Sequence, residues 1–200
     1  MHLADELRAI AMNGLHWSTN EHDRARYDRT LAIAAELASL ADTRNAAEIE
    51  RVFRGDLGMR TPLLSVDAAV FDESGRLLLI QRADNATWAM PGGAAEVGET
   101  PAEAVAREVR EETGLEVRPT QLLGIYDSRR VASPDPAHHY QLVFRCAAIG
   151  GRLVSTSEAM ALEYVREEET AGRRLHPGHG VRIADAFRIH RGDARDAIFQ

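Results

Sequence analysis

The sequence has a single cysteine, few glycines and prolines, and no long hydrophobic run. One cysteine, Cys146, cannot form an internal disulfide, which favours a reducing compartment and therefore a cytoplasmic location. No stretch approaches the roughly 18 apolar residues of a transmembrane helix, and charged residues within Met1–Ile10 interrupt any signal-peptide core. The 15 glycines and 7 prolines exclude a collagen-like chain. These shortages predict a cytoplasmic protein without a membrane partner.

Positive charge is also in deficit. The chain has 24 Lys and Arg residues against 31 Asp and Glu residues, which gives a formal net charge of −7. A negative protein repels the phosphate backbone of nucleic acids, so a nucleic-acid partner is not expected. The hydrophobic content of 44% is enough for a folded core, and 200 residues accommodate one or two domains. The composition therefore predicts an acidic globular protein.

The N-terminal part of the chain has the spacing of three helices. Apolar residues at helical intervals predict a first helix that ends at Asn13-Gly14 and a second that starts within Asn20–Arg24. A third, Ala46–Arg54, is expected to start with a capping box and to end at Gly55. The expected inner faces consist of Leu3, Leu7, Ile10 and Ala11 in the first helix and of Tyr27, Leu31, Ala34, Ala38 and Ala41 in the second.

A segment punctuated by glycine and proline, Gly55–Pro62, is the expected linker to a second domain. We therefore predict a helical N-terminal domain over residues 1–58 and a second domain over residues 63–200. Strands and helices do not strictly alternate in the second domain, which favours an α+β fold with a mixed sheet. Its first expected element is a hairpin of Val66–Val70 and Leu77–Ile80. A strand Tyr140–Ile149 is expected to turn at Gly150-Gly151 into a partner strand that starts at Arg152–Ser155. A strand Leu162–Val165 and a helix Val181–His190 complete the domain.

The most informative segment contains a predicted helix, Pro101–Thr113. Thr100 and Glu103 form a capping box around a proline at the first helical position, and Gly114 supplies the left-handed residue that ends the helix. The expected apolar stripe of this helix consists of Ala102, Val105 and Val109.

Three carboxylates lie beside that stripe. Glu108, Glu111 and Glu112 are spaced so that they project within an arc of roughly 100°. They repel one another unless a cation lies among them, and carboxylates at this density suit Mg²⁺ or Mn²⁺. Arg107 can orient one carboxylate, and the adjacent glycines Gly92-Gly93 allow a backbone carbonyl to approach an ion. A helix with three glutamates is, on that feature alone, more often a solvated acidic face than a metal site.

The spacing of the whole segment favours the metal site. It reads Gly93, five residues, Glu99, seven residues, Arg107-Glu108-Val109, one residue, Glu111-Glu112, one residue, Gly114-Leu115. This pattern matches the Nudix box at all nine specified positions, and the chain resembles the Nudix hydrolases. The preceding segment, Trp88–Gly93, resembles the strand and loop that lead into the box in this family.

The resemblance extends to the N-terminal helices. Gly14–Trp17 and Asp23–Tyr27 are similar to the helical extension of one bacterial Nudix subgroup, associated with nucleoside diphosphates linked to another moiety, notably ADP-ribose and CDP-choline. The resemblance implies an α/β/α sandwich around a mixed sheet. It also implies a pyrophosphohydrolase that cleaves a diphosphate bond by water attack at phosphorus and releases a nucleoside monophosphate. The alternatives are a hydrolase of oxidised nucleoside triphosphates and a catalytically silent nucleotide-sensing module.

The family pattern implies a role for each residue of the box. The implied ligands of Mg²⁺, or of Mn²⁺, are Glu108, Glu111, Glu112 and a backbone carbonyl of Gly92 or Gly93. Glu99 supports the site directly or through water, and Arg107 fixes a metal-binding glutamate. The residues to which catalysis is assigned are Glu111, Glu112, Arg107 and Glu99.

Many family members carry a further glutamate in a strand near position 160. The best-fitting alignment places Ala161 there, so Glu158 or Glu163 could replace it. The identity of the general base stays open, with Glu111 and Glu112 as candidates for part of that role.

Four residues are weaker candidates for substrate contact: Arg82, His138, Trp88 and Glu158. Arg82 could bind a phosphate or form a structural ion pair, and Trp88 could stack on a base or pack beside the loop. His138 either lies near the site's mouth or is an exposed loop residue. His176 and His179 form too small a set to favour a metal site, and Cys146 is expected in the core.

The N-terminal helices give a small core that would gain from packing on another surface. His16-Trp17 and Tyr27 are the candidate contact residues. We therefore expect a homodimer in which this helical domain takes part, acting on a small nucleotide substrate.

Overall fold

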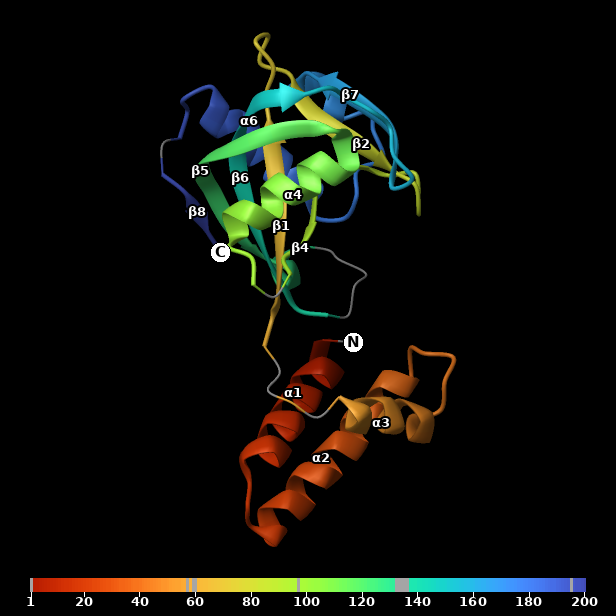
Figure 1. Ribbon diagram of the computed structural model, residues 1–200. Helices are drawn as coiled ribbons and strands as arrows, with labels where there is room; N and C mark the ends of the chain where they lie inside the picture. Colours follow the sequence, from red (N-terminus) through yellow and green to blue (C-terminus); the bar gives the residue numbers. More distant parts are fainter. Residues whose placement is uncertain (1, 57, 59–60, 97, 132–136, 195) are drawn as a thin grey trace. The chain divides into compact units, whose positions relative to one another are not determined.

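The computed structural model describes residues 2–56, 58, 61–96, 98–131, 137–194 and 196–200 (Figure 1). Three residues of the expected linker, 57, 59 and 60, lie outside these ranges. The chain divides into a helical unit, which extends to Pro62 and includes Ala137 and His138, and a mixed unit of strands and helices that starts at Leu63. Within the described ranges, no helix is long and apolar enough to cross a membrane.

Three helices make up the helical unit: α1 (His2–Trp17), α2 (Glu21–Ser39) and α3 (Ala46–Gly55). The start of α2 is as predicted, because the Asn20 side chain caps the helix by accepting a hydrogen bond from the His22 N–H. The start of α3 is also as predicted, with a capping box formed by Asn45 and Glu48. Local sequence signals therefore set both helix starts.

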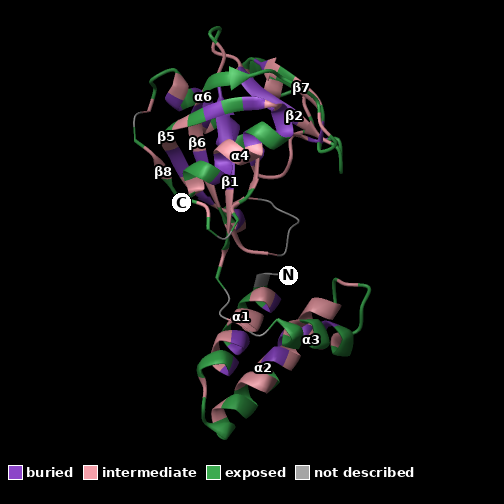
Figure 2. Ribbon diagram, in the orientation of Figure 1, coloured by how far each residue is buried: buried purple, intermediate pink, exposed green. Residues whose placement is uncertain are grey.

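The prediction for α1 was wrong in length and in buried face. The helix continues through Gly14, where a Cβ atom would lie 2.4 Å from the Tyr27 ring, so glycine serves close helix packing there and not helix termination. Leu3 and Ile10, expected inside, are 62% and 56% exposed, whereas Ala11 is buried as expected. The face that packs on α2 lies about 100° further round the helix. The buried residues of this core are Ala11, Met12, Leu15 and Leu31. Figure 2 shows buried stretches of α1 and α2 in purple.

The described residues of the mixed unit form two sheets and three α-helices. Its elements are β1 (Leu63–Val70), β2 (Leu77–Arg82), β3 (Trp88–Ala89), β4 (Gly92–Ala94), α4 (Pro101–Thr113), β5 (Leu115–Asp127), β6 (His139–Gly151), β7 (Ala159–Val165), α5 (Glu167–Thr170), α6 (His179–His190) and β8 (Ile198–Phe199). The larger sheet has the strand order β4-β1-β6-β5-β8 and combines parallel and antiparallel pairs. The smaller sheet, β3-β2-β7, is antiparallel.

Helices α4 and α6, both labelled in Figure 1, contribute to separate cores of this unit according to their buried residues. Successive residues of β1 alternate between them: Ala68 and Val70 belong to the core with Val105 of α4, whereas Ala69 belongs to the core with Ile183 of α6. Side chains of a strand point alternately to its two faces, so β1 is buried on both. The α/β/α sandwich with a mixed sheet, within an α+β fold, is therefore confirmed.

The predicted hairpin is wrong, although its turn is present. β1 and β2 belong to different sheets and are joined near the turn by one antiparallel bridge, Phe71 to Leu77. The physical reason is that both hydrogen-bonding edges of β1 are already occupied. That strand pairs with β4 and β6 on its two edges, which leaves β2 to form the second sheet.

The predicted partner of β6 is also wrong. Gly150-Gly151 does not make a turn, because β6 continues to Gly151, which lies opposite Leu115. The partner is β5, a strand that the sequence analysis did not predict, and residues 152–155 are not in a strand. α6 and β7 begin earlier than predicted, at His179 and Ala159, and Cys146 is buried in the core as expected.

Candidate active site

The helix of the acidic motif starts and ends as its sequence predicts. The Thr100 hydroxyl accepts a hydrogen bond from the Glu103 N–H at 3.3 Å, and Glu103 Oε2 accepts one from the Thr100 N–H at 2.8 Å. Gly114 ends the helix in the left-handed conformation, with φ of 75°. The predicted apolar stripe needs correction: Ala102 is exposed, and the buried residues of α4 are Ala104, Val105, Val109, Glu112 and Thr113.

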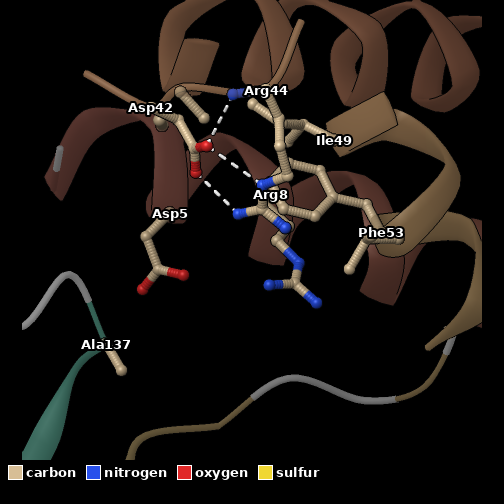
Figure 3. Close-up of a pocket in the computed structure, with 10 residues that line it drawn as sticks. Asp5, Arg8, Asp42, Arg44, Ile49, Phe53 and Ala137 are labelled. Carbon is tan, nitrogen blue, oxygen red and sulfur yellow. Dashed lines mark hydrogen bonds and ion pairs between the residues drawn. The ribbon is translucent and has the colours of Figure 1, made fainter. Parts of the chain in front are cut away.

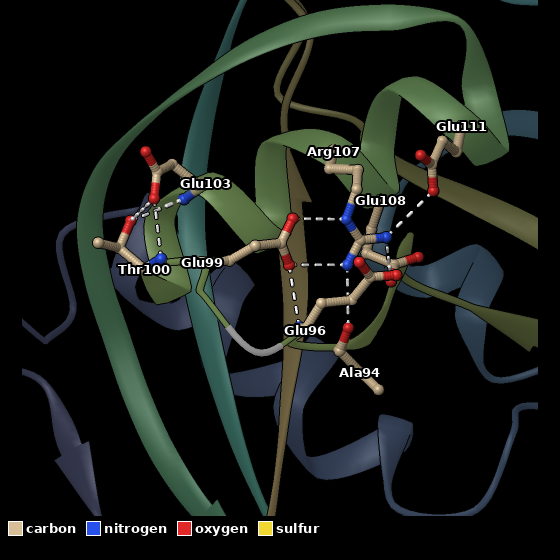
Figure 4. Close-up of polar contacts among 8 residues, drawn as sticks. All are labelled: Ala94, Glu96, Glu99, Thr100, Glu103, Arg107, Glu108 and Glu111. Carbon is tan, nitrogen blue, oxygen red and sulfur yellow. Dashed lines mark hydrogen bonds and ion pairs between the residues drawn. The ribbon is translucent and has the colours of Figure 1, made fainter.

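Arg107 is bound by three of the predicted carboxylates (Figure 4). Its Nε and Nη2 atoms donate to the two oxygens of Glu99 at 2.7 and 3.0 Å. Its Nη1 atom donates to Glu108 at 2.9 Å and to Glu111 at 3.1 Å, and Nη2 also donates to the Ala94 carbonyl at 3.0 Å. The hydrogen bonds from Arg107 lower the pKa of Glu99. One guanidinium therefore orients carboxylates from the loop and from the helix.

Glu112 is the buried carboxylate of the motif, with 5% of its surface exposed. Its Oε2 accepts a hydrogen bond from the Gly92 N–H at 2.8 Å. Burial raises the pKa of Glu112 to about 8; the Gly92 hydrogen bond opposes this shift, and the charges of Glu108 and Glu158 add to it. Three carboxylates thus interact at one point of the site, and a cation there would relieve their repulsion.

Glu108 lies against the glycine loop. A Cβ atom at position 93 would be 2.6 Å from the Glu108 carboxylate carbon, so a larger residue there would displace the Glu108 carboxylate from its present position. Burial raises the pKa of Glu108, and the charges of Glu111 and Glu158 raise it further. Buried oxygen donors that are destabilised in their charged form fit a hard divalent cation.

The donor set for such a cation is incomplete in this conformation. Among the residues that the structure describes, no group of three His, Cys, Asp or Glu side chains is arranged to hold a metal ion. Glu111 accounts for part of this, because its side chain is 52% exposed and its carboxylate is hydrogen-bonded to Arg107. Glu108 and Glu112 are accordingly the two carboxylates whose environment fits a metal best.

A pocket lies beside Glu112. Its lining residues are Arg82, Ala83, Asp84, Glu112, Ser157 and Glu158. Arg82 forms two hydrogen bonds with Asp84, at 3.0 and 2.9 Å, and these raise the pKa of Arg82. The pocket thus combines a fixed cation with the carboxylates of Glu112 and Glu158. Two of the weaker candidates from the sequence, Arg82 and Glu158, are brought together with the motif here.

The other weak candidates lie in different surroundings. The Arg173 guanidinium covers one side of the Trp88 ring, 4.4 Å from its centroid, and Trp88 packs against the α6 core. Glu163 is paired with the same arginine at 2.5 Å, and Ala161 pairs with Gln81 in the smaller sheet. His138 is grouped with the helical unit, and its predicted role stays a prediction.

The helical unit contains a pocket of its own (Figure 3). Arg44 is bound there to Asp42 at 2.6 Å, and the Arg8 guanidinium stacks 4.2 Å from the centroid of the Phe53 ring. These arginines are engaged by neighbouring side chains, and the residues that line the pocket do not belong to the acidic motif.

Comparison with known protein families shows to which family the chain belongs. A profile of the NUDIX domain matches residues 61–185. The chain belongs to the Nudix family. The predicted Nudix hydrolase is therefore confirmed. A second profile, described as the UDP-X-like N-terminal oligomerisation domain, matches residues 1–53. The helical extension that the sequence suggested is thus found in this Nudix hydrolase.

Individual relatives agree with this assignment. "Putative ADP-ribose pyrophosphatase YjhB" from Bacillus subtilis (strain 168) is 34% identical over 150 residues, which cover 74% of this chain and 72% of that protein. An ADP-ribose pyrophosphatase from Methanocaldococcus jannaschii is 39% identical over 107 residues, which cover 52% of this chain and 61% of that protein. The crystal structure of a UDP-X diphosphatase has a TM-score of 0.63 at 23% identity, covers 99% of this chain and 96% of its own, and supports the fold.

Proposed function

We propose that this Nudix hydrolase cleaves the diphosphate bond of a nucleoside diphosphate linked to another moiety, with ADP-ribose and CDP-choline as the first substrates to test. The main support is the set of carboxylates at the Arg82 pocket: burial raises the pKa of Glu108 and Glu112, and the nearby charge of Glu158 adds to both shifts. The names of two relatives favour ADP-ribose. A UDP-linked substrate is the second candidate, favoured by the match of the N-terminal helices to a UDP-X-like domain.

We assign the residues of the box their roles on this basis. Glu108 and Glu112, with Glu111 and a carbonyl of Gly92 or Gly93, would hold Mg²⁺ or Mn²⁺. A divalent metal there neutralises diphosphate charge and lowers the pKa of bound water. Arg107 and Glu99 keep the helix and the loop in register through their paired hydrogen bonds. Hydrolysis of ADP-ribose would add one water across the P–O–P link and give AMP and ribose 5-phosphate.

Glu158 is the best candidate for the further carboxylate that the sequence left open. It lines the Glu112 pocket, and its charge raises the pKa of both Glu108 and Glu112. Glu163 is instead paired with Arg173. We therefore assign Glu158 to metal binding or to proton removal from the attacking water. Arg82, already oriented by Asp84, would bind a substrate phosphate.

We further propose that the protein is a homodimer assembled through α1. Leu3, Ile10 and Trp17 recur every seven residues, lie on one side of the helix and are 62%, 56% and 70% exposed. We call these three residues the α1 stripe. The occupant we assign to it is a second copy of the chain, because this segment matches an N-terminal oligomerisation domain. Of the other two contact candidates, His16 lies edge-on to Trp17 and Tyr27 packs against Gly14 within the unit.

The enzyme's compartment is also part of the proposal. Cys146 is a free and buried thiol, and burial raises its pKa to about 12, so it stays protonated. A single unpaired cysteine is compatible with a reducing cytoplasm.

Product analysis tests the proposed reaction. Purified protein is incubated with ADP-ribose, CDP-choline, a UDP-sugar and 8-oxo-dGTP, each with Mg²⁺, with Mn²⁺ and with a chelator, and the nucleotides are separated by chromatography. We expect nucleoside monophosphate from one or more of the linked diphosphates and none with the chelator. Turnover of 8-oxo-dGTP alone would favour the triphosphatase alternative, and binding without any hydrolysis would favour a sensing module.

A further inference from the structure

A buried polar cluster lies next to the strand pair that carries Gly92. It consists of Asp67 in β1 and of His179 and Arg182 in α6, which are 6%, 5% and 3% exposed. None of the three belongs to the acidic motif. A carboxylate, an imidazole and a guanidinium are costly to bury, so their place in the core calls for an explanation.

The charges in this cluster are paired. Arg182 Nε lies 3.0 Å from Asp67 Oδ2, which makes an ion pair. On the other side of the same carboxylate, His179 Nε2 lies 4.0 Å from Asp67 Oδ1. Asp67 is also directly opposite Gly92 in the antiparallel pair of β1 and β4. The cluster therefore adjoins the backbone from which Glu112 receives its hydrogen bond.

His179 contacts that backbone through its other ring nitrogen. The Met90 N–H donates a hydrogen bond to His179 Nδ1 at 3.2 Å. Burial lowers the pKa of His179, so the ring is neutral. A neutral imidazole that accepts at Nδ1 carries its proton on Nε2, the nitrogen that faces Asp67. Burial raises the pKa of Asp67, and the charge of Arg182 opposes this shift. The Asp67 carboxylate, paired with Arg182, favours this tautomer and so keeps Nδ1 available to Met90.

The short segment after Met90 connects the cluster to the site. The Pro91 carbonyl accepts a hydrogen bond from the Ala68 N–H at 2.8 Å, and the Gly92 N–H donates to Glu112 at 2.8 Å. A Cβ atom at position 92 would lie 2.0 Å from the Val66 carbonyl oxygen, so the backbone here is in close contact with β1. Three successive residues are therefore fixed by His179, by β1 and by Glu112.

We propose that His179, oriented by the Asp67–Arg182 pair, is a positioning residue for Glu112 that acts through the backbone of Met90–Gly92. The proposal rests on the proposed function in one respect, namely that Glu112 binds a divalent metal. Groups that orient metal ligands typically change metal affinity or activity by about 10- to 100-fold when they are removed. His179 would thus affect the metal site without touching the metal or the substrate.

Two substitutions at position 179 distinguish the role of His179 in positioning the Met90–Gly92 backbone from its role in packing the core. His179→Asn keeps a side-chain oxygen near the position of Nδ1 and can accept from Met90, whereas His179→Leu keeps apolar volume and removes the acceptor. Ile183→Ala is the matched control, because Ile183 is a buried residue of the same helix and belongs to the α6 core. The readouts are Mn²⁺ binding by calorimetry and the melting temperature of the metal-free protein.

We expect His179→Leu to weaken Mn²⁺ binding by about tenfold or more, and His179→Asn to remain within a few-fold of the parent. Ile183→Ala should melt earlier with unchanged Mn²⁺ affinity. If His179→Leu does not fold, Asp67→Asn is read in the same titration and should also weaken Mn²⁺ binding, because it removes the charge that selects the tautomer.

The opposite results would overturn the inference. A folded His179→Leu variant that binds Mn²⁺ as tightly as the parent would refute the role of His179 as a hydrogen-bond acceptor. Equal weakening of Mn²⁺ binding in His179→Asn and His179→Leu would refute it as well. A parent protein that fails to bind Mn²⁺ would overturn the metal assignment together with this inference. A parent that binds Mn²⁺ with the expected ranking of variants but cleaves no diphosphate would contradict only the proposed function.

Discussion

Arg107 holds Glu99 through two parallel hydrogen bonds, from Nε at 2.7 Å and from Nη2 at 3.0 Å. The planar guanidinium matches the two carboxylate oxygens, a geometry that lysine cannot reproduce. Glu99 lies in the loop before α4, and Arg107 lies in the second turn of that helix. The pair therefore ties the loop to the helix, and the remaining contacts of Arg107 fix Glu108 and Glu111 relative to both.

Arg107→Lys tests this arrangement. The substitution keeps the positive charge and loses the paired hydrogen bonds, so we expect the kcat for diphosphate hydrolysis to fall by about 10- to 100-fold. Arg110→Lys, at an exposed position of the same helix, should leave the kcat unchanged. Steady-state kinetics on both variants provide the measurement. A rate for Arg107→Lys equal to that of the control would show that the geometry of this side chain is not needed.

Glu112→Gln separates the charge of this residue from its hydrogen bond. The amide oxygen can still accept from Gly92, so the fold should be retained while hydrolysis falls by about a hundredfold or more, as the loss of a metal ligand implies. Glu111→Gln should also reduce turnover by orders of magnitude. Glu73→Gln, in the exposed turn after β1, serves as the control. Rates near those of the parent in both site variants would refute the metal assignment.

The same variant gives a pH-dependent stability difference. Burial raises the pKa of Glu112 from 4.5 to about 8, so the folded chelator-treated protein binds this proton more tightly than the unfolded chain does. The contribution of Glu112 to stability is therefore lost progressively as the pH rises from 4.5 to 8. We expect Glu112→Gln to melt above the parent at pH 8 and to lose this advantage near pH 5. Thermal melting at both pH values is the measurement, and an identical difference at the two would contradict the assignment.

The features that the sequence predicted well are those set by neighbouring residues. The start and end of α4 follow from Thr100, Glu103 and Gly114, which act within one helical turn of each terminus. The position of Arg107 among the glutamates follows from the helical period together with the loop residue Glu99. The acidic motif could therefore be recognised before any tertiary contact was known.

Tertiary packing decided what the sequence did not reveal. The helical period does not predict which face of α1 packs against α2. In the structure, the close contact between Gly14 and Tyr27 identifies that face. Glu112 was placed outside the apolar stripe, yet the Gly92 loop covers it, 20 residues away in sequence. One feature of the sequence could have indicated the buried polar cluster. Asp67 is a charged residue between Val66 and Ala68, in a strand that is otherwise apolar at its centre.

Substitutions of Glu158 and Glu163 test which of the two residues replaces the further glutamate that many Nudix family members carry near position 160. Both flank Ala161, but Glu158 lines the Glu112 pocket and Glu163 is paired with Arg173. We expect Glu158→Gln to lower the kcat by about a hundredfold and Glu163→Gln to change it by less than about threefold. Steady-state kinetics of both variants with saturating metal provide the measurement. The reverse ranking of the two variants would move the role to Glu163.

Ile10→Asp tests the α1 stripe as the contact between two copies of the chain. Ile10 is 56% exposed, so a charge there is tolerated in the monomer, but it would be buried without a partner in a dimer. We expect the parent to sediment at twice the 22.0 kDa of one chain and the variant at 22.0 kDa, with unchanged helix content. Leu40→Asp is the control, because Leu40 is 82% exposed in the same unit, at the end of α2, and lies outside the stripe.

A parent mass of one chain at micromolar concentration would rule out the dimer. A dimer that survives Ile10→Asp would place the contact on another surface, and dissociation by Leu40→Asp alone would place it at the end of α2.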